Sequence, residues 1–160
     1  MQSSQSTNQA DDWNRREFML GSAAATAAFT IVPRRVLGGK GFQAPSDTLN
    51  IAGIGIGGMG KNNLKACEEE NIVALCDVDD KLSAPVYKKY PNAKTYVDFR
   101  MLLEKEKGID AVIVATPDHT HAVVALAAMQ LGKHVYVQKP MSHSVYEARM
   151  MTEEIGRAHV

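Results

Sequence analysis

The chain has 160 residues, of which 45% are hydrophobic and 22% are charged, as expected for a globular protein of about one domain. Eighteen Lys and Arg residues balance eighteen Asp and Glu residues, so nothing favours a nucleic acid or another polyanion as partner. Cys67 and Cys76 are too few for a metal cluster, and their apolar surroundings favour two buried thiols over a disulfide. We therefore expect no metal site.

The N-terminal segment is typical of an export signal. Arg15 and Arg16 precede Phe18 and a run of small and apolar residues that ends at Val32. The run is shorter than the about 20 apolar residues that a helix needs to cross a bilayer. Paired arginines before such a run are typical of a twin-arginine (Tat) signal. We expect this signal over residues 1–37; an amphipathic N-terminal helix is the alternative.

A twin-arginine signal predicts where the protein functions. The signal is read by the Tat translocon, which moves folded proteins out of the cytoplasm. We therefore expect a periplasmic or exported protein, anchored in the membrane if the signal is not cleaved. Small residues suited to cleavage occur at two places, so no single cleavage site is predicted.

After a linker expected over residues 38–48, strand-like and helix-like segments alternate. Apolar runs predict strands at 49–54, 72–76, 94–97, 109–115 and 134–137. Capping residues and glycines predict helices at 58–70, 79–89, 99–107, 119–131 and from Ser144 onward. This alternation predicts an α/β fold, a doubly wound parallel sheet of the Rossmann type, over residues 49–154.

A glycine-rich loop follows the first predicted strand. Residues 55–60, GIGGMG, fit the pattern G-x-G-x-x-G and open a predicted helix. Gly55 permits a tight turn, Gly57 lets the backbone approach a pyrophosphate, and Gly60 lets the helix and strand pack closely. The helix N-terminus then offers free N–H groups to the anion. The alternative is a glycine-rich turn without a ligand.

An acidic residue lies at the end of the second predicted strand. Asp77 follows Gly55 by about 20 residues, where a carboxylate can accept a hydrogen bond from an adenosine ribose. A carboxylate at this position repels a 2′-phosphate, so NAD is expected as the cofactor and NADP is less favoured. Lys61 and Lys81 are near enough in sequence to weaken this preference, and a simple helix cap is the alternative role for Asp77.

Two further polar loops, residues 116–121 (TPDHTH) and 138–140 (QKP), follow the fourth and fifth predicted strands. Ligands bind at the carboxyl ends of the strands in a doubly wound sheet, so both loops are expected at the site. Asp118 is either a helix cap or a ligand contact. The two histidines are spaced i, i+2 and point apart on a helix, so they do not predict a metal pair. Lys139 is either a solvated lysine or a cation that eases loss of a substrate hydroxyl proton.

Four segments in order along the chain resemble the Gfo/Idh/MocA oxidoreductases, in particular a bacterial branch with Tat signals: IAGIGIGGMG, IVALCDVD, VATPDHTHA and GKHVYVQKP. The resemblance covers about residues 47–153. It implies an N-terminal Rossmann domain that binds NAD(P). It also implies that Lys139, the lysine of the family's Glu-Lys-Pro motif, is catalytic and lies near the nicotinamide and the substrate. Gln138 replaces the usual glutamate, which removes a carboxylate that could tune the lysine.

The resemblance also implies that Thr116, Pro117 and His121 lie along the cofactor's ribose and nicotinamide. Together with the glycine loop and the acid, these residues complete the expected cofactor site. Its members are Gly55, Gly57, Gly58, Met59, Gly60, Asp77, Thr116, Pro117, His121, Gln138 and Lys139.

The resemblance implies a C-terminal α+β domain that carries the substrate pocket and usually a catalytic histidine, and we expect this domain to be absent from the chain. We therefore expect the N-terminal part of an enzyme that is inactive alone. The complete enzyme is expected to be a homo-oligomer that transfers a hydride to or from a sugar or polyol hydroxyl. Two alternatives stay open. One is a glycosidase that oxidises a sugar transiently with tightly held NAD, and the other is a non-catalytic NAD-binding module.

The last residues of the chain differ from the helix that they follow. Gly156 breaks the helical pattern, and one back-translation of EIGRAHV contains the start of a common sequencing adapter. We expect that residues 155–160 are a non-native tail. An ordinary helix end is the alternative.

Overall fold

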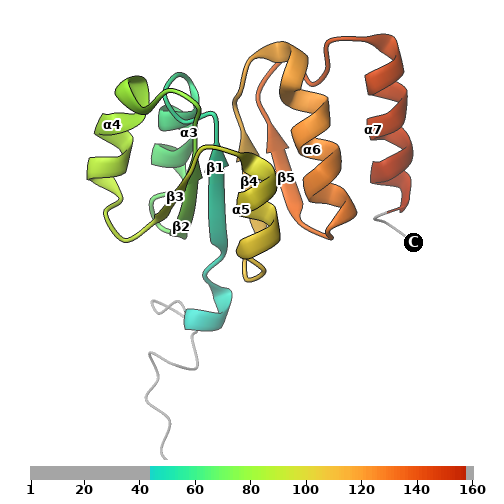
Figure 1. Ribbon diagram of the computed structural model, residues 1–160. Helices are drawn as coiled ribbons and strands as arrows, with labels where there is room; N and C mark the ends of the chain where they lie inside the picture. Colours follow the sequence, from blue (N-terminus) through green and yellow to red (C-terminus); the bar gives the residue numbers. More distant parts are fainter. Residues whose placement is uncertain (1–43, 158–160) are drawn as a thin grey trace, which may run out of the picture. The chain divides into compact units, whose positions relative to one another are not determined.

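The computed structural model describes residues 44–157 (Figure 1). The expected signal over residues 1–37 and most of the expected linker lie outside this range, as do residues 158–160. Among the helices of the described range, none is both long enough and apolar enough to cross a membrane.

Five strands of this range form one parallel sheet in the order β3-β2-β1-β4-β5. The strands are β1 (Asn50–Ile54), β2 (Asn71–Cys76), β3 (Lys94–Tyr96), β4 (Ala111–Val114) and β5 (His134–Val137). The helices are α3 (Gly60–Ala66), α4 (Asp80–Lys89), α5 (Phe99–Lys105), α6 (His121–Gln130) and α7 (Val145–Arg157), and the 3₁₀ turns are η1 (Pro45–Asp47) and η2 (Asp118–Thr120). The predicted doubly wound fold is confirmed.

Alternate residues of the central strands pack on opposite faces of the sheet. Ala52 and Val112 belong to the core that α5 and α6 cover, whereas Ile51 and Ile113 belong to the core under α3 and α4. Figure 1 shows α7 beside α6, and these two helices share a third, smaller core around Met151. Both faces of β1 and β4 are therefore buried, which explains their continuous apolar sequences.

The chain winds outward in two directions from the centre of the sheet. From β1 it moves to β2 and then to β3, and after α5 it crosses to β4 on the other side of β1 and then to β5. The point between β1 and β4 is therefore the topological switch point, where sheets of this kind open a crevice at the carboxyl ends of their strands.

Side-chain caps start three of the helices at the predicted places. Asp79 accepts hydrogen bonds from the amides of Lys81 and Leu82, each at 3.0 Å, and opens α4. Asp98 accepts from the amide of Arg100 at 2.9 Å and opens α5. These bonds satisfy amide groups that have no partner inside the helix.

The predicted capping box opens α7. The Glu147 amide donates to Ser144 Oγ at 3.2 Å, and the Ser144 amide donates to Glu147 Oε2 at 2.9 Å. The helix continues through Gly156 to Arg157, so the expected break at this glycine does not occur. Glycine costs only about 1 kcal/mol inside a helix, which the other residues of the turn can offset. The non-native origin of residues 155–160 stays a prediction.

Some helix ends differ from the predicted ones. Residues 56–59 form a turn, and α3 begins only at Gly60. Before α6 the backbone forms η2, in which Thr120 Oγ1 donates to the Pro117 carbonyl at 2.8 Å. Gly132, with φ +71°, ends α6 as predicted, but α5 ends at Lys105 without a left-handed Gly108. A glycine therefore predicted the helix end correctly at Gly132, where φ is positive, and incorrectly at Gly108, where φ is not positive.

Neither cysteine forms a disulfide. Cys76 is buried at the end of β2, and Cys67 is half-buried just after α3. Burial raises the pKa of the Cys76 thiol to about 12, so the sulfur stays protonated and neutral at physiological pH. The prediction of two thiols is confirmed, although only one of them is fully buried.

Candidate functional site

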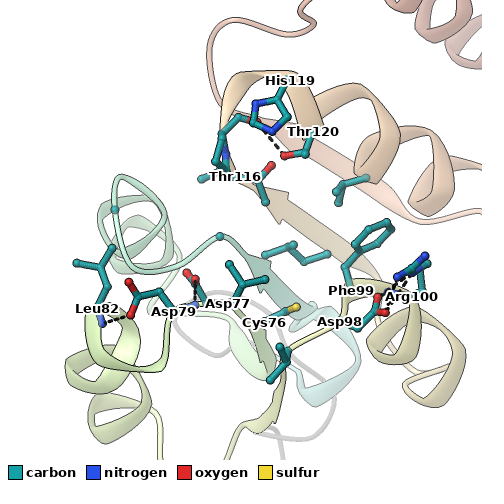
Figure 2. Close-up of a pocket in the computed structure, with 18 residues that line it drawn as sticks. Cys76, Asp77, Asp79, Leu82, Asp98, Phe99, Arg100, Thr116, His119 and Thr120 are labelled. Atoms are coloured by element: carbon teal, nitrogen blue, oxygen red, sulfur yellow. Dashed lines mark hydrogen bonds and ion pairs between the residues drawn. The ribbon is translucent and has the colours of Figure 1, made fainter.

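A cavity of about 800 Å³ opens at the carboxyl ends of β1, β2 and β4 (Figure 2). Its walls are the glycine loop, the segments that follow β2 and β3, and the loop that follows β4. In Figure 2, Asp77, Asp79 and Leu82 lie on one side of the cavity and Thr116 lies across from them. The cavity thus lies at the switch point, and its volume is within the usual range for small-molecule sites.

Three glycines of the loop lie where an added Cβ would come too close to a neighbour, which is backbone for Gly55 and Gly60 and the exposed Leu82 side chain for Gly57. Gly55 has φ +80°, and a Cβ there would lie 2.5 Å from the Thr116 amide nitrogen. A Cβ on Gly57 would lie 2.7 Å from Leu82 Cγ, and one on Gly60 would lie 2.3 Å from the Gly55 carbonyl oxygen. These short distances give each of the three glycines a separate steric role, in the turn, against α4 and between helix and strand.

The other two glycines of the segment differ from each other. A Cβ on Gly58 would have no atom within 4 Å, so the loop surface is open there. A Cβ on Gly53 would lie 2.9 Å from Ile56 Cγ2 and 3.1 Å from Leu64 Cδ1. Gly53 is therefore needed to seat α3 on β1, a role that the sequence pattern did not indicate.

Asp77 connects the end of β2 to the glycine loop. Its Oδ2 accepts from the Gly57 amide at 2.8 Å, and its Oδ1 accepts from the Asp79 amide at 3.0 Å. The carboxylate lines the cavity and each oxygen keeps a lone pair for a further donor, such as a ribose hydroxyl. Asp79 and Asp80 follow closely and add negative charge, which disfavours a phosphate group at this end.

The rim of the cavity is apolar beside Asp77. Val78 is 84% exposed, Val97 is 61% exposed and Leu82 is 57% exposed, and all three side chains line the cavity. Large aliphatic side chains this exposed indicate a surface that binds a flat apolar group such as a purine. Sequence reasoning missed these residues, although Val97 directly follows β3 and Val78 directly follows Asp77 at the end of β2.

The loop after β4 supplies the opposite wall. Thr116 and Pro117 line the cavity, as does His119, which the sequence analysis did not select. The Thr116 hydroxyl is buried and has no hydrogen-bond partner among the described residues. Because Thr116 lines the cavity, its hydroxyl is available to a polar ligand there.

The loop after β5 lies next to this wall but does not line the cavity. The Gln138 amide donates to the Val114 carbonyl at 2.8 Å, and the Gln138 side-chain oxygen accepts from Asn63 Nδ2 at 3.3 Å. Lys139 is exposed, and its ammonium group makes no hydrogen bond or ion pair within residues 44–157. A cis peptide bond joins Lys139 to Pro140.

His121 lies inside the fold. The side chain is 1% exposed, and its two ring nitrogens face the backbone carbonyls of Thr116 and Pro140. It does not line the cavity.

The predicted site residues thus fall into two groups. Five of them line the cavity: Gly55, Gly58, Asp77, Thr116 and Pro117. The other six do not line it: Gly57, Met59, Gly60, His121, Gln138 and Lys139. In the described range, no group of three His, Cys, Asp or Glu residues could hold a metal ion.

The cavity has the features expected of a dinucleotide site. It has an acidic end with an apolar rim, a loop without side chains at the centre, and an unpaired hydroxyl on the far wall. These features match, in this order, the adenosine, the pyrophosphate and the nicotinamide half of NAD.

Comparisons with known proteins agree with this geometry. The family model described as "Oxidoreductase family, NAD-binding Rossmann fold" matches residues 49–160. A glycosyl hydrolase family 109 protein of Stenotrophomonas maltophilia is 36% identical over 132 residues, which cover 74% of this chain and 28% of that protein. Myo-inositol 2-dehydrogenase of Thermotoga maritima is 30% identical over 113 residues, which cover 70% of this chain and 34% of that protein.

Solved structures are similar as well. The WlbA dehydrogenase of Bordetella pertussis, in complex with NADH and UDP-GlcNAcA, has a TM-score of 0.64 at 23% identity and covers 71% of this chain and 35% of its own. A probable dehydrogenase of Thermotoga maritima has a TM-score of 0.61 at 31% identity, and the match covers 70% of this chain and 34% of that one. The chain spans about a third of the length of the curated relatives that it matches. It belongs to the Gfo/Idh/MocA oxidoreductase family, and its described part is the NAD-binding Rossmann domain of that family.

Proposed function

We propose that the complete protein is an NAD-dependent oxidoreductase that transfers a hydride to or from a hydroxyl-bearing carbon of a sugar or polyol. The observation that carries the proposal is the cavity at the switch point, with Asp77 at one end and the unpaired Thr116 hydroxyl at the other. The myo-inositol 2-dehydrogenase among the relatives supports a polyol or sugar as substrate.

The strand order supports an arrangement of the proposed site along one edge of the sheet. Asp77 at the end of β2 holds the adenosine ribose, and the amides of the glycine loop at the end of β1 face the pyrophosphate. The loops after β4 and β5 then lie at the nicotinamide half. When bound, NAD supplies the carbon that accepts or donates the hydride. Thr116 and Lys139 are therefore next to the reacting end of the cofactor.

Lys139 is the group of this chain best placed to act on the substrate. Its ammonium group has no partner within residues 44–157, so it is free to hydrogen-bond a substrate oxygen. When an alcohol is oxidised, the C–H hydride leaves with its electron pair, the O–H proton passes to a base, and a carbonyl forms. A cation beside the oxygen stabilises the negative charge that builds up there. Gln138 is neutral, so it does not offset this charge.

Binding of NADH by the 160-residue chain tests the cofactor site. We expect Asp77→Asn to weaken NADH binding about tenfold, because the amide loses the charge that strengthens hydrogen bonds to the ribose and to Gly57. We expect NADPH to bind more weakly than NADH to the wild type, and the difference to shrink in Asp77→Asn. Both affinities can be measured by fluorescence titration.

The matched control is Asp110→Asn, because Asp110 also accepts from a backbone amide, that of Asn50 at 2.8 Å, but lies outside the cavity. It should leave the NADH affinity unchanged. Equal losses in Asp77→Asn and Asp110→Asn would show that the effect comes from fold stability, and would remove the ribose role of Asp77.

A second function is favoured by one observation, the glycosyl hydrolase family 109 relative at 36% identity. In such an enzyme, a sugar hydroxyl is oxidised transiently, a glycosidic bond breaks by elimination, water adds to the resulting double bond, and the hydride returns to the sugar. The net reaction is hydrolysis without net oxidation. The two functions differ in a direct assay of the complete protein with an aryl glycoside. Release of the aglycone without net NADH identifies the glycosidase, whereas NADH accumulation identifies the dehydrogenase. NADH binding with neither outcome identifies a non-catalytic module.

We further propose that the protein carries its NAD through the Tat translocon into the periplasm. Arg15 and Arg16 before an apolar run support this proposal, and free NAD is scarce outside the cytoplasm. The complete protein, purified from the periplasm without added nucleotide, should contain NAD by mass spectrometry. Replacing both arginines with lysine should keep the protein in the cytoplasm. Periplasmic protein that lacks NAD would contradict the proposal.

A further inference from the structure

His121 is one of only two polar side chains that are fully buried in residues 44–157. It is the first residue of α6, directly after the loop that carries Thr116, and its side chain is 1% exposed. A buried imidazole needs a partner for each nitrogen, because an unpaired polar atom in this position costs stability.

Both partners of the ring are hydrogen-bond acceptors. Nδ1 lies 2.6 Å from the Pro140 carbonyl oxygen, and Nε2 lies 2.6 Å from the Thr116 carbonyl oxygen. A neutral imidazole has one N–H group, so it can donate to only one of them and directs a lone pair at the other. Both contacts are hydrogen bonds only when the ring carries a proton on each nitrogen. Charge-assisted hydrogen bonds are short, in keeping with the two contacts of 2.6 Å.

The two carbonyls belong to the two loops at the nicotinamide end of the site. Thr116 follows β4 and Pro140 follows β5, and these strands are neighbours in the sheet. The β5 loop is also held at Gln138, through its amide to the Val114 carbonyl and through its side chain to Asn63. Lys139 lies between these two anchors. The His121 ring therefore holds this loop at Pro140, the residue that follows Lys139.

We propose that His121 is a positioning residue: its doubly protonated ring clamps the Lys139–Pro140 loop onto the Thr116 loop and so fixes the nicotinamide end of the cofactor site. The ring does not touch the cofactor itself, because it is buried beneath the cavity and does not line it. The role of these loops rests on the proposed function, whereas the clamp is a property of the free chain.

The first test is nitrogen-15 NMR of the histidine rings in the cofactor-free chain, with His121 assigned by its absence in His121→Gln. The clamp predicts that both ring nitrogens of His121 carry a proton, with slow hydrogen exchange. Each is expected to show a coupling across a hydrogen bond to a carbonyl carbon. A ring with one bare nitrogen would overturn the double clamp. This result does not depend on whether the chain binds NADH.

The second test compares NADH with ADP-ribose, which lacks the nicotinamide. We expect His121→Ala to lower the affinity for NADH about tenfold, as the loss of hydrogen bonds to a charged group predicts, and to leave the affinity for ADP-ribose nearly unchanged. His121→Gln keeps one donor and should show an intermediate loss. A purely structural role predicts equal losses for both ligands, and that outcome would overturn the positioning role.

Leu103→Val is the matched control, because Leu103 is 3% exposed in the core under α5 and lies away from both loops. It should lower stability without changing the ratio of the two affinities. If the wild-type chain binds neither NADH nor ADP-ribose, the proposed cofactor site fails, and the NMR measurement alone decides the clamp.

Discussion

Replacing Gly55 with alanine is expected to lower NADH affinity by on the order of a hundredfold and to destabilise the fold by about 3 kcal/mol. The backbone at Gly55 has φ +80°, which costs a residue with a Cβ atom about 1 to 3 kcal/mol. The new Cβ would also lie 2.5 Å from the Thr116 amide nitrogen and 2.6 Å from the Ala115 carbonyl carbon. Both are backbone atoms, so β1 and the β4 loop must move apart.

That movement opens the site at its centre. The Gly55 amide donates to the Cys76 carbonyl at 2.8 Å, and the Ala115 amide donates to the Ile54 carbonyl at 2.9 Å. These bonds connect β1 to the ends of β2 and β4, which carry the two halves of the expected dinucleotide site. Displacing Gly55 therefore changes the distance between the adenosine and nicotinamide ends, in addition to straining the loop.

Gly58→Ala is the control for the Gly55 experiment. Gly58 lies three residues further along the same loop, its φ is not positive, and a Cβ there meets no atom within 4 Å. The free energy of unfolding of the Gly58→Ala variant in urea should differ from that of the wild type by less than about 0.5 kcal/mol. If Gly55→Ala were as stable as Gly58→Ala, the left-handed turn and the close contact with the β4 loop would not hold in solution.

The parts of the structure that could be predicted are those that depend on neighbours in sequence. The caps at Asp79 and Asp98 are fixed by amides two or three residues away, and the sequence places both correctly. The steric role of Gly60 depends on Gly55, five residues before it, and the G-x-G-x-x-G pattern records that spacing. Local patterns therefore predict the helix starts and the shape of the glycine loop.

The burial of His121 could not be predicted in this way. Its Nδ1 partner is the Pro140 carbonyl, which reaches the ring only because β5 pairs with β4 over Val114 and Val137. Nothing near His121 in the sequence shows that a second acceptor will lie on the far side of its ring. The position of Val97 beside Val78 is likewise a result of the pairing of β3 with β2. Contacts between distant segments decide these parts of the site.

Lys139→Met in the complete enzyme is expected to lower the rate of hydride transfer by about 10² to 10⁴, the usual contribution of a positioned acid–base group. Methionine is an unbranched side chain only one atom shorter than lysine, and it removes the charge and the donors. Because Lys139 is exposed and has no partner within residues 44–157, the substitution leaves no buried group unpaired, and the fold should keep its stability.

The measurement separates chemistry from binding. NADH formation at saturating substrate, over a panel of sugars and polyols that includes myo-inositol, gives kcat, and fluorescence titration gives the NADH affinity. We expect kcat to fall by the full factor and the NADH affinity to change little, because Lys139 acts on the substrate oxygen. Lys88 is an exposed lysine on α4 that does not line the cavity. The control variant Lys88→Met should match the wild type in both kcat and NADH affinity. Wild-type kcat in Lys139→Met would exclude this lysine from the reaction.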